Sequence, residues 1–71
     1  QKELRKLTRR IAEIENQLED IEAREEAINQ AMLATNDAVE LVDLQKELDA
    51  LSEQQEVLMS EWEELSEQVE G

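Results

Sequence analysis

The chain contains no cysteine, no histidine and no proline, and its single glycine is the last residue. Without cysteine it can form neither disulfides nor thiolate metal sites, and the redox compartment stays open. The lack of both histidine and cysteine excludes the common nucleophile–base dyads, zincin helices and zinc fingers. An EF-hand loop needs a central glycine and a di-iron bundle needs Glu-x-x-His pairs, so neither metal site is expected.

Long apolar stretches are also missing. The longest uncharged run, residues 27–36, is half of the roughly 20 residues needed to cross a bilayer, and it includes Asn29 and Gln30. No apolar segment of the kind found in signal peptides is present, so no membrane contact is expected. Because the sequence opens with Gln1 rather than methionine, we expect it to be a fragment of a longer chain.

What the chain has in excess is negative charge: 20 acidic against 7 basic residues among 71, a net charge of −13. A high net charge with one aromatic residue is typical of disorder, but the apolar residues follow a regular pattern. Their spacing alternates between three and four, the heptad rhythm of a coiled coil, with one polar position in each stripe. The first stripe is Leu4, Leu7, Ile11, Ile14, Leu18, Ile21, Glu25, Ile28 and Met32, and the second is Leu41, Leu44, Leu48, Leu51, Gln55, Leu58, Trp62, Leu65 and Val69.

The stripes are separated by A-T-N-D, residues 34–37. Thr, Asn and Asp side chains compete for backbone hydrogen bonds and weaken a helix. Asp37 and Glu40 have the spacing of a helix N-cap with its reciprocal carboxylate. We therefore predict an all-α fold, a two-helix antiparallel coiled-coil hairpin in a single domain (1–71), with helices over about 2–33 and 38–70 and a turn at about 34–37.

The register of the hairpin can be predicted from the charges beside the stripes. If Leu7 faces Trp62, Arg10 lies opposite Glu61 and Arg24 lies opposite Glu47. A register shifted by one heptad would instead place both arginines opposite glutamines. The first register also centres the turn beside the predicted cap, and it is the one we predict. It places the ring of Trp62 over Leu7, with the aliphatic stems of Lys6 and Arg10 against it.

Two polar residues occupy stripe positions, Glu25 and Gln55. A buried catalytic carboxylate at Glu25 would make the chain an enzyme. The alternative is that Glu25 sits at the edge of the helix interface, reaches water and helps to set the register, and Gln55 has the same alternative. We name no catalytic, cofactor-binding or metal-binding residue, and we predict that this chain is not an enzyme and holds no cofactor.

Five of the seven basic residues lie within the first ten, and the hairpin brings the acidic C-terminal segment to the same end. Two interpretations follow: contact with nucleic-acid phosphates, or salt bridging to the acidic segment together with solubility. The negative charge of the rest of the chain opposes a phosphate backbone. The residues predicted for nucleic-acid contact are Lys2, Arg5, Lys6, Arg9 and Arg10.

Particular sequence stretches resemble a known family. K-E-L-R-K-L-T-R-R-I-A-E-I-E at residues 2–15, the weak central break, and L-M-S-E-W-E-E-L-S-E at residues 58–67 are similar to the C-terminal coiled-coil domain of ABC-F ATPases, with W-E-E-L the most telling part. The resemblance implies a cytoplasmic, non-catalytic interaction or regulatory appendage of paired ATP-binding cassettes. It also implies ATP in the parent protein, action on ribosomes, and nucleic-acid binding by the C-terminal domain in some members.

The sequence departs from that family in two respects. Its central turn has neither the proline nor the aromatic residue often found there, and the hairpin is acidic where a nucleic-acid-binding member would be basic. The alternative to an ABC-F appendage is a structural coiled-coil spacer or dimerisation segment of an unrelated protein, for which self-association would be expected.

Overall fold

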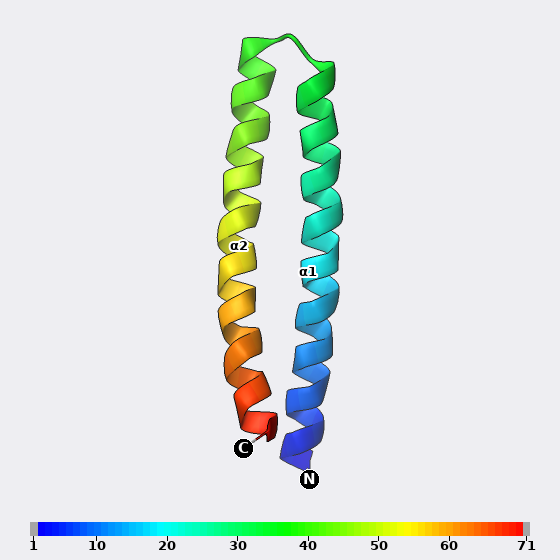
Figure 1. Ribbon diagram of the computed structural model, residues 1–71, viewed down its shortest axis with the longest axis vertical. Coiled ribbons are helices and arrows are strands. Elements are labelled where there is room, and N and C mark those ends of the chain that lie inside the picture. Colours follow the sequence, from blue (N-terminus) through cyan, green and yellow to red (C-terminus); the bar gives the residue numbers. More distant parts are fainter. Residues whose placement is uncertain (1, 71) are drawn as a thin grey trace.

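The computed structural model describes residues 2–70, with side chains from residue 3 onward, and shows two long helices joined by a short turn (Figure 1). Helix α1 spans Lys2–Ala34 and helix α2 spans Ala38–Glu70. The helices run antiparallel and pack against each other over their length, so the two ends of the chain lie together. The predicted all-α helical hairpin is confirmed. The molecule is a rod of 54 × 15 × 14 Å.

The turn is built without glycine, and none of the described residues has a positive φ angle. Instead, side chains satisfy the backbone groups left free at the start of α2. The Asp37 carboxylate accepts a hydrogen bond from the Val39 N–H at 2.9 Å, and its carbonyl accepts one from the Leu41 N–H at 3.0 Å. Asp37 is therefore the N-cap of α2, as its spacing predicted.

The reciprocal half of the predicted cap differs from the expected arrangement. Glu40 was expected to reach back to the Asp37 N–H, but that N–H donates to the Thr35 hydroxyl at 3.2 Å. The Thr35 hydroxyl in turn donates to the Glu40 carboxylate at 2.9 Å. A hydroxyl group has one proton to donate and lone pairs to accept, so Thr35 can link the two groups. The turn is thus held by a three-residue chain of hydrogen bonds.

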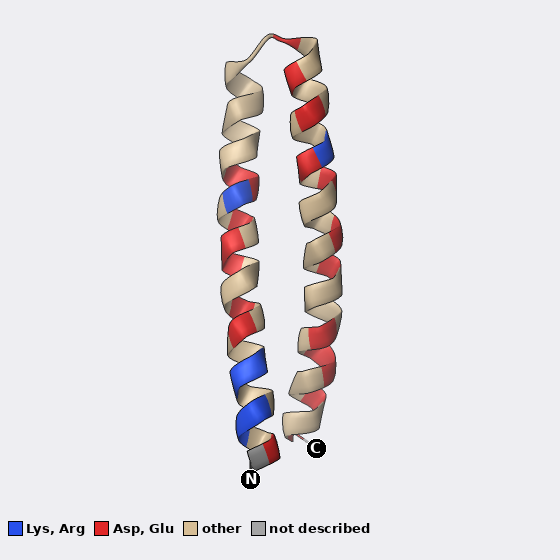
Figure 2. Cartoon of the chain, turned by 180° about the vertical axis from the view of Figure 1, so that it is seen from behind, with Lys and Arg blue, Asp and Glu red and all other residues tan. Residues whose placement is uncertain are grey.

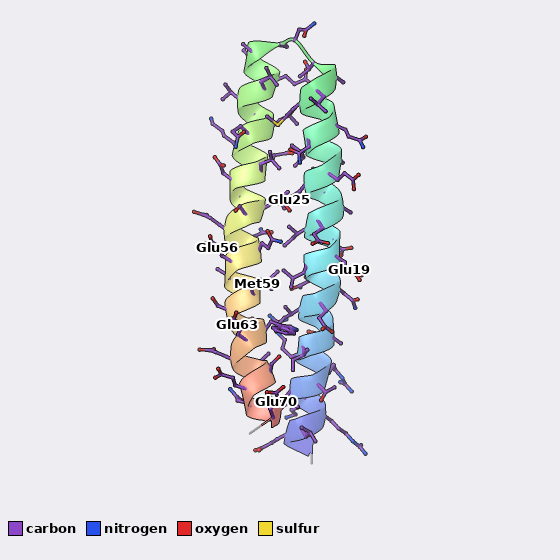
Figure 3. The ribbon with its side chains drawn as sticks, viewed as in Figure 1. Glu19, Glu25, Glu56, Met59, Glu63 and Glu70 are labelled. Carbon is purple, nitrogen blue, oxygen red and sulfur yellow. The ribbon has the colours of Figure 1, made fainter. Side chains whose placement is uncertain are left out.

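The core of the hairpin is a single row of side chains. Ile14, Ile21 and Ile28 are 0%, 6% and 4% exposed and lie seven residues apart, at one heptad position of α1. Most other stripe residues, including Glu25 and Gln55, are half-buried. Figure 3 shows the side chains that fill the space between the helices, Glu25 among them. A two-helix coil has no third element to cover its flanks, so complete burial is confined to the centre of the seam.

Two ion pairs between the helices confirm the predicted register. Arg10 contacts Glu61 at 2.7 Å, and Arg24 contacts Glu47 at 3.8 Å. The register shifted by one heptad would have given neither pair. Within residues 2–70, neither helix has a stretch that is long and apolar enough to cross a membrane.

Candidate nucleic-acid interface

The open end of the hairpin carries the predicted basic residues, which lie on the first turns of α1 (Figure 2). Arg5, Lys6 and Arg9 are exposed. Residues three and four apart are neighbours on a helix surface, so Arg5 and Arg9 share a side of α1 and Lys6 lies next to Arg9. The structure therefore brings these three cations together on the outside of the rod. Lys2 begins α1, but its side chain lies outside the described part of the chain.

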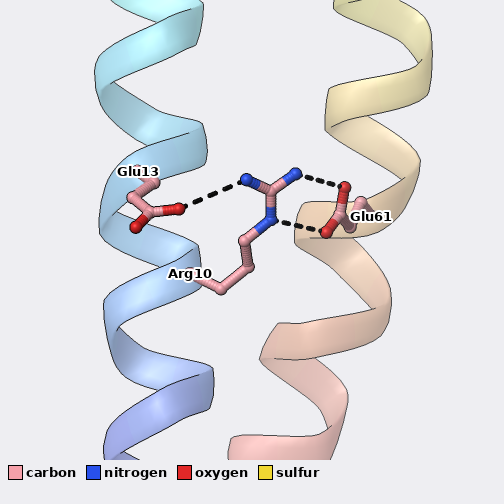
Figure 4. A network of polar contacts seen from close by, with 3 residues as sticks. All are labelled: Arg10, Glu13 and Glu61. Atoms are coloured by element: carbon pink, nitrogen blue, oxygen red, sulfur yellow. Dashed lines mark hydrogen bonds and ion pairs between the residues drawn. The ribbon is translucent and has the colours of Figure 1, made fainter.

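Arg10 has a different environment from its three neighbours. Its guanidinium donates two hydrogen bonds to Glu61, from Nε at 2.7 Å and from Nη2 at 2.9 Å, and one from Nη1 to Glu13 at 3.3 Å (Figure 4). A two-pronged arginine–carboxylate contact is among the stronger side-chain pairs. The hydrogen bonds that Arg10 donates to Glu61 raise the pKa of Arg10 and lower the pKa of Glu61. Arg10 is thus engaged in joining the two helices.

The salt-bridge part of the second interpretation is confirmed for Arg10, and for its described neighbours only the solubility part of that interpretation remains. Among the side chains that the structure describes, Arg5, Lys6 and Arg9 form no ion pair with the acidic end of α2. The physical reason is position on the helix. Arg10 borders the seam, where the facing helix supplies Glu61, whereas the other three point away from it. Three of the five predicted contact residues are therefore available to an outside anion.

Trp62 was expected to cover Leu7, with the stems of Lys6 and Arg10 against its ring. It is half-buried, and its indole N–H donates to the Glu15 carboxylate at 3.4 Å. Glu15 lies two turns of α1 closer to the hairpin turn than Leu7, in the direction of the α2 N-terminus. Helical side chains lean toward the N-terminus of their own helix, and for Trp62 this is the direction of Glu15. The contacts of the ring with Leu7 and with the stems of Lys6 and Arg10 stay predictions.

The sequence did not lead us to two hydrogen-bond partners in this region, Glu13 for Arg10 and Glu15 for Trp62. Glu13 lies three residues after Arg10, a spacing that indicates an intrahelical pair and could have identified it. Glu15 as the partner of Trp62 could not be found from heptad positions alone, because it depends on the direction of a large side chain. Shallow hollows lie on the flanks of the hairpin, and the one beside the indole is lined by Glu15, Asn16, Leu18, Glu19, Met59 and Trp62.

No group of three acidic residues within the described part of the chain could hold a metal ion. Glu25 is half-buried between the helices, and in this part of the chain no hydrogen bond or ion pair involves it. Such a position corresponds to the interface-edge alternative for Glu25, in which the carboxylate reaches water.

Comparison with known protein families gives a match that covers nearly the whole chain. A family model described as ABC transporter C-terminal domain matches residues 1–67. No curated protein and no solved structure matches the chain.

Proposed function

Because the chain belongs to the ABC transporter C-terminal domain family, we propose that it is the non-catalytic interaction or regulatory appendage of an ABC-F-like ATPase. In this proposal the cassettes of the parent protein bind and hydrolyse ATP in the cytoplasm, and the hairpin contributes contact with ribosomal RNA or DNA. The family match supports the role of the hairpin as a C-terminal appendage. The contact with nucleic acid is supported by the open end of the hairpin.

The observation that carries the nucleic-acid proposal is the unpaired state of Arg5, Lys6 and Arg9 within the described structure. An exposed arginine with no carboxylate partner keeps its guanidinium donors free for phosphate oxygens. Apart from Glu3 in the first turn of α1, the acidic residues at this end belong to α2, on the other side of the seam (Figure 2). A phosphate backbone approaching α1 from outside would therefore meet the cations before the carboxylates of α2.

The net charge of −13 sets limits on this contact. The remainder of the rod repels phosphate, so the contact area is confined to the first turns of α1. Trp62 is half-buried, and the described surface offers no other aromatic ring on which a base could stack. Binding through a few cations without stacking is weak and independent of sequence. Its affinity should fall steeply with salt.

A gel shift with ribosomal RNA and with duplex DNA, at several salt concentrations, tests the proposal. The informative variant is Arg5→Gln/Arg9→Gln, and the matched control is Arg24→Gln/Lys46→Gln, which removes the same positive charge near the turn. We expect the first variant to bind more weakly, with the slope of log affinity against log salt reduced by about 2 on duplex DNA. The control should bind as the unchanged chain does.

Equal binding by both variants, or no binding at low salt by the unchanged chain, would refute the nucleic-acid contact. The alternative role as a dimerisation segment has its own measurement, sedimentation equilibrium of the same samples. A stable dimer without binding would favour self-association as the role of the hairpin.

A further inference from the structure

The seam of the hairpin repeats every seven residues on both helices. On α1, the row that supplies the core holds Leu7 and the three buried isoleucines. One row of α2 seam positions holds only leucine: Leu44, Leu51, Leu58 and Leu65. Because the residues within each row are alike, sliding α2 along α1 by one heptad brings apolar residues opposite apolar residues again. The apolar pattern therefore fits a second register as well as the observed one.

The two registers differ little in the apolar residues that they pair. The observed register pairs Leu4 and Leu41 across the seam. It leaves Met32 and Val69 beyond the ends of the paired layers. A shift of one heptad that draws α2 toward the closed end exchanges these two sets. Leu4 is already 50% exposed, so its departure from the seam loses little apolar contact.

The two polar seam residues do not oppose the shift. Glu25 faces a leucine in both registers, Leu44 before the shift and Leu51 after it. Gln55 faces an isoleucine of α1 in both. Polar seam residues select a register when they pair with each other, and Glu25 and Gln55 meet in neither register. The seam itself therefore does not select the observed register.

The contacts that select the observed register lie outside the seam. They are the ion pairs of Arg10 and Arg24 with α2, at 2.7 and 3.8 Å, and the Asp37 cap. After the shift both arginines would face glutamines. The turn would also move by about half a heptad toward α2, which removes the cap. Partly exposed ion pairs and a single cap each contribute little, so a binding partner can offset their loss.

The shifted register changes the open end of the hairpin. Helix α2 moves by about 10 Å toward the closed end and carries its acidic last turns away from the first turn of α1. Glu61 then lies opposite Gln17, which leaves Arg10 with Glu13 as its partner. One more guanidinium thus becomes available beside the exposed cations of α1, while the carboxylates of α2 withdraw.

We propose that the hairpin slides by one heptad between these two registers, and that a phosphate backbone favours the shifted one. The second half of this inference rests on the proposed nucleic-acid contact. Phosphates bind the shifted register more strongly because it offers Arg10 as a further donor and fewer neighbouring carboxylates. A ligand moves a two-state equilibrium toward the state that it binds better. Glu61 therefore restrains Arg10 until phosphate binds.

Distances between spin labels test the sliding. Because the chain has no cysteine, two introduced cysteines carry the labels at chosen places. Asn29→Cys/Ser60→Cys labels one exposed position on each helix. The shift brings Ser60 toward Asn29, so we expect a second distance that is shorter by up to about 10 Å. The control Asn16→Cys/Asn29→Cys has both labels on α1 and should give one distance throughout.

The informative variant in the labelled chain is Glu47→Gln/Glu61→Gln, which removes both ion pairs between the helices. The matched control is Glu53→Gln/Glu64→Gln, which removes the same charge from exposed positions of α2 outside the described ion pairs. We expect the shorter distance to increase in the first variant and not in the control. The first variant should also bind duplex DNA about threefold tighter than the control at low salt. Adding DNA to the chain with both ion pairs should increase the shorter distance.

A single long distance in Glu47→Gln/Glu61→Gln, with and without DNA, would overturn the inference. An equal increase of the shorter distance in the control variant would do so too, because loss of any carboxylate would then suffice. A shorter distance that disappears on dilution with unlabelled chain would come from a dimer and would also overturn it. If no variant binds DNA at low salt, the proposed function fails, while the distances measured without DNA still decide whether the hairpin slides.

Discussion

The two helices of the hairpin have equal length, 33 residues each, but unequal roles in the core. Helix α1 supplies Ile14, Ile21 and Ile28, and no residue of α2 is buried to the same degree. Ile11, at the other seam position of α1, is only half-buried, so the heptad position matters and not the residue type alone.

The helices differ in charge as well. Among the residues of α1, six basic residues accompany eight acidic ones, whereas α2 has Lys46 as its single base among eleven acids. Most acidic residues of α2 therefore have no base to pair with on their own helix, and the described ion pairs between the helices join Arg10 and Arg24 of α1 to Glu61 and Glu47. The comparison shows that α1 carries both the buried core and the cations on which α2 depends.

The largest loss of stability is expected when a buried residue of α1 is truncated, and it tests whether α1 supplies the core. Ile21→Ala should destabilise the hairpin by about 2–4 kcal/mol, since it removes buried methyl groups and leaves a cavity. Leu51→Ala, at a half-buried position of α2, should cost less, about 1–2 kcal/mol, because much of that side chain already contacts water. Urea or thermal unfolding followed by circular dichroism measures both.

Ile21→Val serves as a milder variant in case the alanine variant does not fold, with an expected loss of about 0.5–1.5 kcal/mol. Equal losses at Ile21 and Leu51 would contradict the assignment of the core to α1.

A smaller effect is expected at the start of α2. Asp37→Ala removes the carboxylate that accepts the Val39 N–H and should cost about 1 kcal/mol. Asn36→Ala is the control, because the hydrogen bonds of the described turn do not involve the Asn36 side chain. If Asn36→Ala were the more harmful of the two in thermal unfolding, the capping role of Asp37 would be refuted.

Lowering the pH tests the effect of the negative charge of α2. Protonation of carboxylates relieves the repulsion along α2, so we expect higher helicity near pH 4.5 than at pH 7.5 in low salt. The difference should shrink as salt is added, because exposed charges are screened. A circular-dichroism titration that shows lower helicity at pH 4.5 than at pH 7.5 would contradict the expectation that repulsion between carboxylates weakens the helix.

The smallest effects are expected at the ion pairs. Because the pKa of Glu61 is lowered in the folded state, its pairing with Arg10 stabilises the hairpin above the ordinary carboxyl pKa of 4.5. That stabilisation is lost as the pH falls through the lowered value. Arg10→Gln should therefore destabilise the hairpin at pH 7 and have less effect at pH 2.

Arg24→Gln is the matched control for Arg10→Gln, and we expect it to have less effect than Arg10→Gln at pH 7. Its contact with Glu47 is longer, at 3.8 Å, and both side chains are at least half exposed. A pH-independent loss in Arg10→Gln would mean that the aliphatic stem matters and the charge does not.

Much of the hairpin could be predicted because the pairing of its helices depends on the spacing of residues along the chain. Heptad spacing predicted the helices, and charges beside the stripes predicted the pairing of Arg10 with Glu61. The predicted nucleic-acid contact nevertheless included Arg10, although the same register placed it opposite Glu61. The structure shows the strength of that pairing: the Arg10 guanidinium is held by Glu61 and Glu13, whereas Arg5 and Arg9 have no described carboxylate partner.

The sequence by itself determined the two helices, the turn at Asp37 and the register, because each depends on the spacing of residues along the chain. Only the tertiary structure decided that the Trp62 indole reaches Glu15 and that Thr35 links Asp37 to Glu40. These features depend on the direction in which each side chain points, and the spacing of residues does not specify that direction.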